Sequence, residues 1–362
     1  MKLVVLGLSL SSSWGNGHAT TYRALLKAFA ERGHCVHFLE RDVPWYRDHR
    51  DLDDPSWCRL HFYRDLAGLD HWRGELMRAD AVIVGSYVPD GVDVGRFVQS
   101  IAHGVTAFYD IDTPVTLAKL ERSEFDYLSP DLIPRYQLYL SFTGGPTLRR
   151  IEQRFGSPAA RALYCSVDPA AYPPLHIEKR WDLSYLGTYS PDRQPAFERL
   201  LLDVARAMPE RRFAVAGPQY PDAIDWPANV ERIDHVPPAQ HPRFYAASRY
   251  TLNITRADMV SAGWSPSVRL FEAAACAVPV ISDIWPGIEE LFVPGREIVL
   301  ARGTDDVVAE LRSTDRTAEV TGQAARERVL RDHSAAHRAA ELEGCLQEAI
   351  DCEVRPRLVA AE

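Results

Sequence analysis

The chain has 362 residues, 46% of them hydrophobic and 25% charged, which predicts a soluble globular protein of about two domains. Its net charge of −9 argues against nucleic-acid binding as the main task, because no basic stripe offsets it. No apolar run approaches the ~20 residues of a membrane span, and the opening MKLVVLG is too short for a signal sequence. Six cysteines show no paired spacing, so we expect reduced thiols, a cytoplasmic location, and neither a disulfide framework nor a zinc site.

The first half of the chain alternates strand and helix patterns. An apolar run at 2–8 leads into a polar loop, and residues 19–32 then repeat apolar side chains at helical spacing. Further strand patterns occupy 34–40, 80–85, 105–110, 136–142 and 162–166, with a helix near 91–102. Alternation of this kind predicts a mostly parallel sheet covered on both faces.

A Pro-rich stretch, DPAAYPP at 168–174, is the predicted domain boundary. After it a second series of elements begins, with strands at 182–187, 212–217, 230–233, 250–254, 278–283 and 297–300, a helix at 195–208 and closing helices over 316–350. We therefore predict Rossmann-like domains at 1–168 and 175–335, and a C-terminal helix at 336–362 that packs back toward the first domain. Domains of this type bind ligands at the carboxyl ends of their strands.

The most informative stretch is GWSPSVRLFEAAACAVPVISD, residues 263–283. Pro266 suits a first helical turn, Ser265 is then the predicted N-cap, and Ser267 is a second hydroxyl near the free N–H groups. A helix start of this kind favours phosphate, and Arg269, within one turn, adds a forked charge-assisted contact. The Glu272 carboxylate lies on a neighbouring face, where it can accept hydrogen bonds from a sugar diol. One helix thus offers a phosphate end, a cation and a diol acceptor.

This pattern resembles the donor-nucleotide motif of GT-B glycosyltransferases, especially the spore-maturation-type branch. The resemblance implies two Rossmann-like domains facing each other across a cleft, with closing C-terminal helices. It implies that Glu272 binds the ribose hydroxyls of a nucleotide-sugar and that the helix start binds its diphosphate. Many retaining members carry a second Glu eight residues earlier, where this chain has Trp264, so an inverting mechanism is favoured.

The loop after the first strand contains Gly15-Asn16-Gly17-His18. As a dinucleotide fingerprint it is broken, because Thr20 replaces the third glycine; a nicotinamide- or flavin-dependent enzyme with Glu40 on the ribose is nevertheless one alternative. In inverting GT-B enzymes a similar Gly-His lies on the acceptor side. The resemblance therefore implies that Gly17 belongs to the ligand site and that His18 is a general base. A His that only caps the helix or contacts ligand is an equal competitor.

Two carboxylates, Asp110 and Asp112, follow the strand pattern at 105–110. They superficially match the motif of haloacid-dehalogenase-type phosphatases, which is a minor alternative. Within the glycosyltransferase interpretation, Asp112 orients His18 or binds an acceptor hydroxyl, and Asp110 is the less favoured of the two. Capping of the next helix by Asp112 or Thr113, ahead of Pro114, is the competing structural explanation.

Several loops of the second domain complete the predicted donor site. Gly187 allows close backbone approach, Thr188 offers a hydroxyl, and Arg193 and Arg256 are candidate phosphate ligands. By resemblance, the loops that begin at Gly217 and His235 seat the nucleotide base. No Asp-x-Asp pair lies near these positions, so we expect metal-independent chemistry.

The sequence thus predicts a glycosyltransferase that moves a hexosyl or related group from a nucleoside-diphosphate sugar (UDP, dTDP or GDP) to an acceptor hydroxyl, more readily with inversion. The donor is a substrate, and no tightly bound cofactor is expected. We expect no nucleic-acid partner and no transmembrane segment, and a homodimer is one option for the assembly. The base, the sugar and the acceptor are not specified by the sequence.

Overall fold

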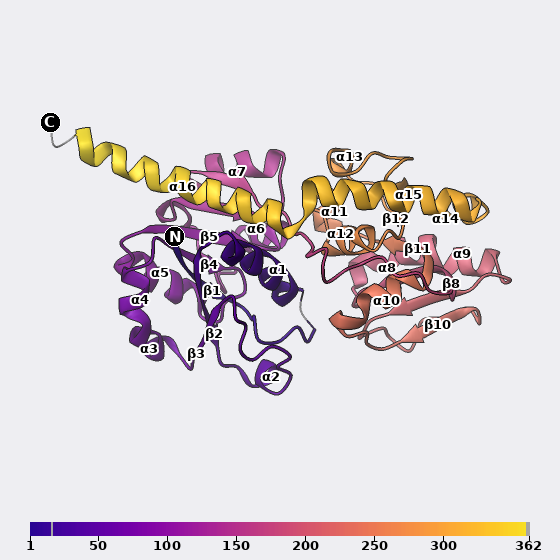
Figure 1. Ribbon diagram of the computed structural model, residues 1–362, viewed down its shortest axis with the longest axis horizontal. Coiled ribbons are helices and arrows are strands. Elements are labelled where there is room, and N and C mark those ends of the chain that lie inside the picture. Colours follow the sequence, from indigo (N-terminus) through magenta and orange to yellow (C-terminus); the bar gives the residue numbers. More distant parts are fainter. Residues whose placement is uncertain (16, 360–362) are drawn as a thin grey trace. The chain divides into compact units, whose positions relative to one another are not determined.

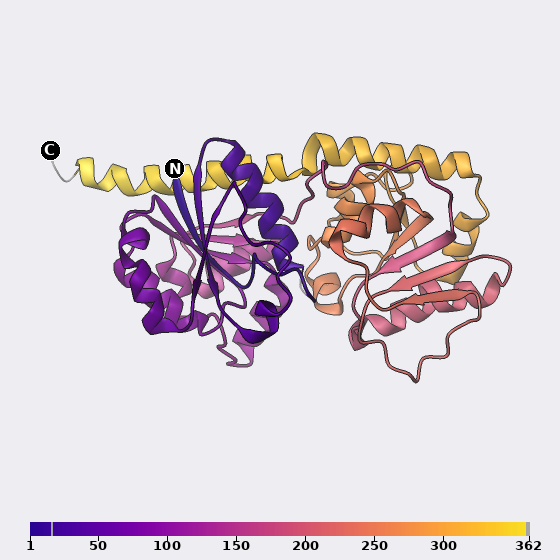
Figure 2. The ribbon, with the colours of Figure 1, turned by 60° about the horizontal axis from the view of Figure 1, so that its bottom comes forward.

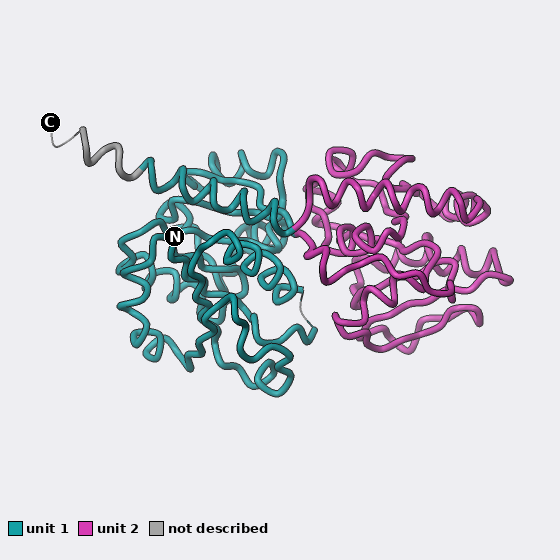
Figure 3. Tube along the Cα trace, in the orientation of Figure 1, with its two compact units in different colours: residues 1–165, 335–362 teal, residues 166–334 magenta. Residues whose placement is uncertain are grey.

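The computed structural model describes residues 1–15 and 17–359, with side chains up to Cys352. It divides into two compact units, shown in Figure 3. Unit 1 comprises Met1–Cys165 together with the chain from Ala335 onward, and unit 2 comprises Ser166–Ser334. Because the chain returns to unit 1 at its end, the first unit is built from two separate segments.

Unit 1 contains a seven-stranded sheet in the order β3-β2-β1-β4-β5-β6-β7. Every neighbouring pair is parallel. Its strands are β1 (Lys2–Gly7), β2 (Cys35–Arg41), β3 (Arg59–Tyr63), β4 (Ala81–Gly85), β5 (Val105–Asp110), β6 (Leu138–Ser141) and β7 (Ala160–Ala162). The order reverses direction between β1 and β4, which places the topological switch point there.

Helices flank this sheet, as Figures 1 and 2 show. They are α1 (His18–Glu31), α2 (Pro44–Arg47), α3 (Leu66–Leu69), α4 (Arg73–Met77), α5 (Gly91–Ile101), α6 (Thr113–Glu121), α7 (Pro146–Phe155) and α16 (Ala335–Val359). Alternate side chains of a strand point to opposite faces, and accordingly Val4 and Leu6 share one core with Val94 and Val98 of α5. The C-terminal helix α16, yellow in Figure 1, packs against α1, β5 and β6.

Unit 2 contains a six-stranded parallel sheet in the order β10-β9-β8-β11-β12-β13. Its strands are β8 (Trp181–Leu186), β9 (Phe213–Ala216), β10 (Val230–Ile233), β11 (Ser248–Asn253), β12 (Val280–Ser282) and β13 (Val299–Leu300). Its helices are α8 (Gln194–Phe197), α9 (Asp203–Ala207), α10 (His241–Ala246), α11 (Ala257–Ala262), α12 (Val268–Ala275), α13 (Ile288–Leu291), α14 (Thr304–Leu311) and α15 (Asp315–Arg328). The switch point of this sheet lies between β8 and β11.

The structure differs from the sequence expectations in three places. The last strand of unit 1 is Ala160–Ala162, earlier than the predicted 162–166. Residues 44–77 contain β3 and the three short helices α2, α3 and α4, which the sequence analysis did not predict. The Pro-rich stretch 168–174 lies inside unit 2, where the buried Tyr172 side chain anchors it. Among the described residues, no helix is long and apolar enough to cross a membrane.

Candidate functional site

The predicted donor residues of unit 2 lie on loops at the carboxyl ends of its strands and on the start of α12. Gly187 follows β8, Gly217 follows β9, and Arg256 follows β11. Because β8 and β11 are neighbours on either side of the switch point, the loops after them meet at one position on the sheet edge. Parallel α/β sheets bind ligands at such a position.

The start of α12 corrects one expectation. The helix begins at Val268 with Ser267 as its N-cap residue, so the predicted N-cap at Ser265 and Pro266 in the first turn are wrong. Ser267 makes no side-chain cap; its hydroxyl donates instead to Asn253 Oδ1 at the end of β11, at 2.7 Å. Ser265 is buried, with 2% of its surface exposed. Because the Ser267 hydroxyl bonds to Asn253, it does not cap the helix.

Arg269 ties α12 to the two central strands. Its Nε donates to the backbone carbonyl of Leu186 at 2.6 Å, and its Nη1 donates to Asn253 Oδ1 at 2.9 Å. The guanidinium carbon lies 4.9 Å from the ring centre of Tyr185. These contacts fix the guanidinium in place at the switch point, and Nη2 makes no hydrogen bond within the described part of the chain.

Two glycines allow the backbones of β8 and β9 to approach each other closely. A Cβ atom on Gly217, where φ is +142°, would lie 2.1 Å from the Gly187 carbonyl oxygen and 3.1 Å from Thr188 N. A Cβ atom on Gly187 would lie 2.8 Å from Arg269 Nη2. Gly187, Thr188 and Gly217 are therefore brought together beside Arg269; a side chain at position 217 would clash with backbone atoms, whereas one at position 187 would displace the Arg269 and Tyr185 side chains.

Arg193 and Arg256 bring two more positive charges to this region. Arg193 Nη2 donates to the Thr188 carbonyl at 2.6 Å, and its buried Nε has no acceptor among the described residues. Burial lowers the pKa of Arg193, and the charges of Arg269 and Arg256 lower it further. The three cations are thus close enough to repel one another, and such a cluster favours an anionic ligand.

Glu272, on α12, is 4% exposed. Its Oε1 accepts a hydrogen bond from Tyr172 at 2.8 Å and its Oε2 accepts one from Tyr245 at 3.0 Å. Burial alone would raise the pKa of Glu272, but the nearby His241 ring, whose Nδ1 lies 3.7 Å from Oε2, and hydrogen bonds from the two tyrosines bring it below its usual value. The carboxylate is therefore ionised and already hydrogen-bonded by its own chain.

His235, the other predicted residue of unit 2, is exposed on the loop after β10. The same loop is attached to the Glu272 cluster, because His241 Nε2 lies 3.1 Å from the Val236 carbonyl oxygen. The structure thus connects this loop to Glu272 through His241, although the His235 side chain makes no hydrogen bond or ion pair within the described part of the chain.

In unit 1, His18 is the first residue of α1 and Gly17 is its N-cap residue. The His18 side chain is 9% exposed, and its Nδ1 has no partner among the described residues. Burial lowers the pKa of His18 below 6.5, while the charge of Asp112 acts in the opposite direction. A largely neutral imidazole near neutral pH is the form that accepts a proton. Asn16, in the same loop, lies outside the described residues.

Asp112 is the N-cap residue of α6, but its side chain makes no cap hydrogen bond. It interacts instead with His18 and hydrogen-bonds to the hydroxyl of Tyr87. Capping of α6 thus does not account for this carboxylate. These three residues follow the carboxyl ends of three different strands: His18 follows β1, Tyr87 follows β4 and Asp112 follows β5.

Asp110 differs from Asp112 because it is fully buried. Its oxygens accept from Tyr139 at 2.5 Å and Thr116 at 2.7 Å, and Thr116 in turn contacts the Tyr127 hydroxyl at 2.8 Å. Burial raises the pKa of Asp110 to about 7. Tyr127 also interacts with Tyr87, which in turn interacts with Asp112, so the buried Asp110 network is linked to Asp112 through these two tyrosines.

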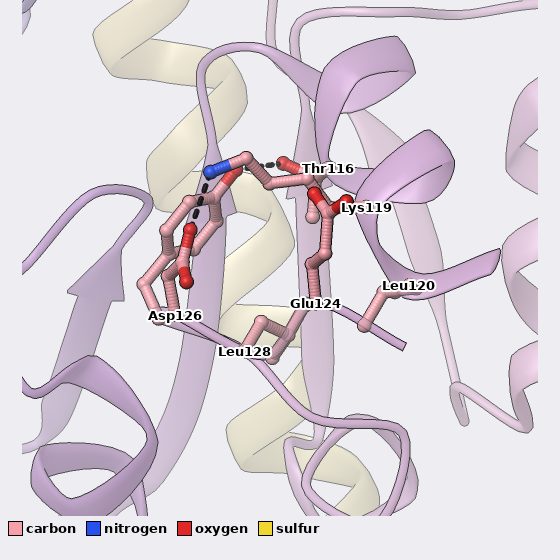
Figure 4. Close-up of a pocket in the computed structure, with 7 residues that line it drawn as sticks. Thr116, Lys119, Leu120, Glu124, Asp126 and Leu128 are labelled. Atoms are coloured by element: carbon pink, nitrogen blue, oxygen red, sulfur yellow. Dashed lines mark hydrogen bonds and ion pairs between the residues drawn. The ribbon is translucent and has the colours of Figure 1, made fainter. Parts of the chain in front are cut away.

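Thr116 and Tyr127 also line a shallow surface pocket beside α6, shown in Figure 4. Across its mouth Lys119 Nζ pairs with Asp126 at 2.5 Å. Lys119 lies 5.4 Å from the Tyr127 ring centre, so its charge covers the aromatic wall of the pocket. None of the predicted site residues lines this pocket.

Comparison with known proteins places these sites in a family context. Residues 193–344, which include the whole Arg193–Glu272 region, match the family described as glycosyl transferase-like. The chain carries a glycosyltransferase domain. No curated protein sequence matches it.

Solved structures match along nearly the whole chain. Sucrose-phosphate synthase from Thermosynechococcus elongatus is 14% identical with a TM-score of 0.68, and 100% of each chain is covered. HepE of Anabaena, in complex with UDP and glucose, is 12% identical with a TM-score of 0.69, covering 96% of this chain and 100% of that one. An alpha-glucosyltransferase in complex with UDP and a 13-mer DNA is 11% identical with a TM-score of 0.69, covering 95% and 99%. The predicted GT-B fold and the glycosyltransferase class are confirmed at the level of fold and family domain.

The GT-B assignment does not favour the two alternative enzyme classes, and the site geometry gives the reasons. Glu40, the ribose ligand of the dehydrogenase alternative, is 1% exposed and accepts from Leu10 N at 2.7 Å and Ser11 Oγ at 2.7 Å. It holds the loop after β1 in place. Asp110, the first acid of the phosphatase motif, is fully buried by Tyr139 and Thr116 and is not placed to attack a substrate.

Three residues near these sites were not predicted from sequence. Tyr87 (φ 62°) and Trp264 (φ 44°) adopt left-handed backbone conformations, which are rare for bulky residues and concentrate at functional sites. Tyr172, assigned to a linker, is a partner of Glu272. No sequence signal marks the left-handed backbone of Tyr87 or Trp264, but a tyrosine next to prolines is a candidate for a buried anchor.

Proposed function

We propose that the protein transfers a sugar from a UDP-sugar to an acceptor hydroxyl, with inversion and without a metal ion. The observation that carries this proposal is the convergence of Arg193 and Arg269 on the backbone at the end of β8, beside the start of α12, with Arg256 next to Ala257, whose N–H bonds to Asp192 in the loop after β8. Phosphate groups are the ligands that such forked cations bind best.

The diphosphate accounts for the cations. A UDP diphosphate carries two or more negative charges, and three guanidiniums neutralise them without a divalent ion. Arg193 and Arg269 keep free N–H groups after their internal bonds, as described above. The backbone N–H groups of Gly187 and Gly217 are bonded to the carbonyls of Ala216 and Ile233, so these glycines contribute space beside the anion and not hydrogen bonds.

The choice of UDP rests on the solved relatives. HepE was crystallised with UDP-glucose, and the alpha-glucosyltransferase with UDP, each on the same fold. We place the uracil near the loops of Gly217 and His235 and the ribose at Glu272, as the sequence motif indicates. Membership of the spore-maturation-type branch remains a further part of this proposal.

For catalysis we propose that His18 is the general base. It takes the proton of the acceptor hydroxyl as that oxygen forms a bond to the anomeric carbon. The bond from that carbon to the diphosphate breaks in the same step, so UDP leaves and the configuration inverts. Asp112 stabilises the imidazolium that forms. Trp264 stands where retaining enzymes of similar motif carry an acid.

Thermal unfolding against UDP, dTDP, GDP, NAD and FAD tests the donor site. UDP at 100 times its dissociation constant stabilises by about 2.7 kcal/mol, and Arg269→Ala should remove most of that shift. Arg243→Ala, on the exposed side of α10, is the matched control. Stabilisation by NAD or FAD alone would overturn the proposal. Incubation with UDP-glucose and EDTA, with NMR of the product anomer, then tests metal independence and inversion.

A further inference from the structure

The carboxylate of Glu272 is enclosed by hydroxyl groups from two different parts of unit 2. Tyr172 Oη lies 2.8 Å from Oε1, and Tyr245 Oη lies 3.0 Å from Oε2. At 4% exposure, Glu272 has little open surface on which a ligand could add a third partner. A ribose diol supplies the same chemistry as these two hydroxyls: two O–H donors directed at one carboxylate.

The two tyrosines are not equivalent. Tyr245 is 0% exposed on α10, and among the described residues its hydroxyl bonds only to Glu272. Tyr172 belongs to the irregular segment before β8 and is flanked by Pro173. Its hydroxyl also lies 3.4 Å from His241 Nδ1. Tyr172 thus has a second partner within reach, whereas Tyr245 has none.

His241 is oriented to receive that hydroxyl. Its Nε2 faces the Val236 carbonyl at 3.1 Å, and a carbonyl only accepts, so Nε2 carries the hydrogen. In the neutral ring Nδ1 is then an acceptor, and it lies 3.7 Å from Glu272 Oε2, beyond hydrogen-bond distance, so it can accept from Tyr172. The Tyr172 hydroxyl can therefore donate to Glu272 Oε1 or to His241 Nδ1 with a small rotation.

We propose that Tyr172 competes with the donor nucleotide for Glu272: its hydroxyl occupies the Glu272 oxygen that the donor ribose takes, and passes to His241 when nucleotide binds. This inference rests on the proposed function, because it needs a ribonucleotide at Glu272. Because the Tyr172 hydroxyl moves from Glu272 to His241, binding of the ribose leaves no buried hydroxyl without a hydrogen-bond partner.

The exchange also lowers nucleotide affinity. The ribose gains a hydrogen bond to Glu272 only by displacing one that already exists. Its hydroxyls therefore contribute less binding free energy than they would at a carboxylate without a partner. A hydrogen bond to a charged group corresponds to roughly ten- to a hundred-fold in affinity. Since UDP is both part of the donor and the product, this competition favours its release after transfer.

The test is calorimetric titration of UDP and 2′,3′-dideoxy-UDP into the wild type, Tyr172→Phe and Tyr245→Phe. Phenylalanine keeps the ring and removes only the hydroxyl, so each variant is the control for the other. In Tyr172→Phe we expect UDP to bind about ten-fold more tightly and dideoxy-UDP to bind as before, because only the ribose hydroxyls reach Glu272. In Tyr245→Phe we expect no tightening of UDP.

Three results are decisive against the inference. Weaker UDP binding in Tyr172→Phe would make Tyr172 a support for Glu272 and not a competitor. An equal change for both nucleotides would show that the effect does not pass through the ribose. Unchanged affinities would mean that the donor does not use Glu272 Oε1. If the wild type binds neither nucleotide, the proposed function fails first, which the thermal-shift panel shows separately.

Discussion

Tyr87 packs edge-on against His18, with ring centroids 5.2 Å apart and planes at 84°, while its own backbone has φ of 62°. A bulky residue in the left-handed region costs of order 1–3 kcal/mol and persists only where its surroundings hold it. Here the hydroxyl is held by Asp112 and Tyr127 and the ring by His18. The strained loop after β4 therefore positions both members of the proposed catalytic pair.

Tyr87→Phe should lower the turnover rate about ten-fold, the value of one hydrogen bond, with little change in the KM for donor. The ring still packs on His18, but Asp112 loses a partner that orients it. Steady-state kinetics with UDP-glucose measures both constants. Tyr63→Phe is the matched control, because that hydroxyl in unit 1 is buried and has no hydrogen-bond partner among the described residues. An equal loss in the two variants would assign the effect to packing.

The pH dependence of the rate should report His18. The base must be neutral, and burial lowers its pKa, so the midpoint of the acid limb should lie below 6.5, the ordinary pKa of histidine. The Asp112 carboxylate raises the His18 pKa, so Asp112→Asn should move the acid limb to lower pH while reducing the maximal rate. The rates of the wild type and Asp112→Asn, measured between pH 4.5 and 8.5, show in which direction the acid limb moves. A limb that moves upward, or does not move, contradicts the assignment of His18 and Asp112 as a pair.

The architecture was predictable because its signals are local. Runs such as Leu3–Leu6 and Ala81–Val84 are apolar throughout, as strands buried on both faces must be. The strand β3 has no such run: Arg59 and Phe62 are exposed and only Tyr63 is fully buried, so nothing in the residues marks it. Its position is set by pairing with β2, which is a tertiary property.

The site was predictable in its residue types more than in its contacts. Arg269 and Glu272 stand out by their spacing after Ser-Pro-Ser. The predicted N-cap was wrong because the helix begins at Val268, and the Ser267 hydroxyl bonds to Asn253, fourteen residues away in sequence, in place of capping the helix. The tyrosines around Glu272 lie 100 and 27 residues from it, and no short motif encodes such contacts.

Asp110 should make the stability of unit 1 depend on pH. Its carboxyl has an ordinary pKa of 3.8, and burial raises it to about 7 in the folded protein. Below pH 4 the group is protonated in both states; between about 4 and 7 only the unfolded chain ionises, so stability is lost as pH rises through this window. Each unit in the window costs about 1.4 kcal/mol from this group.

Asp110→Asn removes this titrating group, so the variant should lose less folding stability than the wild type as the pH rises from 4 to 7. Denaturant unfolding of the wild type and the variant at pH 5 and pH 7 gives the difference directly, because the other groups cancel. We expect the variant to gain roughly 2–3 kcal/mol relative to the wild type between the two pH values. Asp93→Asn, at an exposed position on α5, should show no such gain. A pH-independent difference would indicate that Asp110 is ionised throughout.

Gly187→Ala tests the geometry of the anion site without removing a charge. The new Cβ would lie 2.8 Å from Arg269 Nη2 and 2.8 Å from the Tyr185 hydroxyl, so the guanidinium must shift away from its position. Arg269 is held by Leu186 and Asn253, and a shift weakens those bonds as well as any contact with phosphate. A charge-assisted hydrogen bond is worth roughly 1.5–3 kcal/mol, so the UDP dissociation constant should rise about ten- to a hundred-fold. Calorimetric titration measures this rise, and Gly303→Ala is the control, since its nearest neighbour would be a flexible arginine side chain at 4.0 Å. If Gly187→Ala binds UDP as the wild type does while remaining folded, the diphosphate does not lie against the β8 loop, and the anion site must be sought on the Arg256 side.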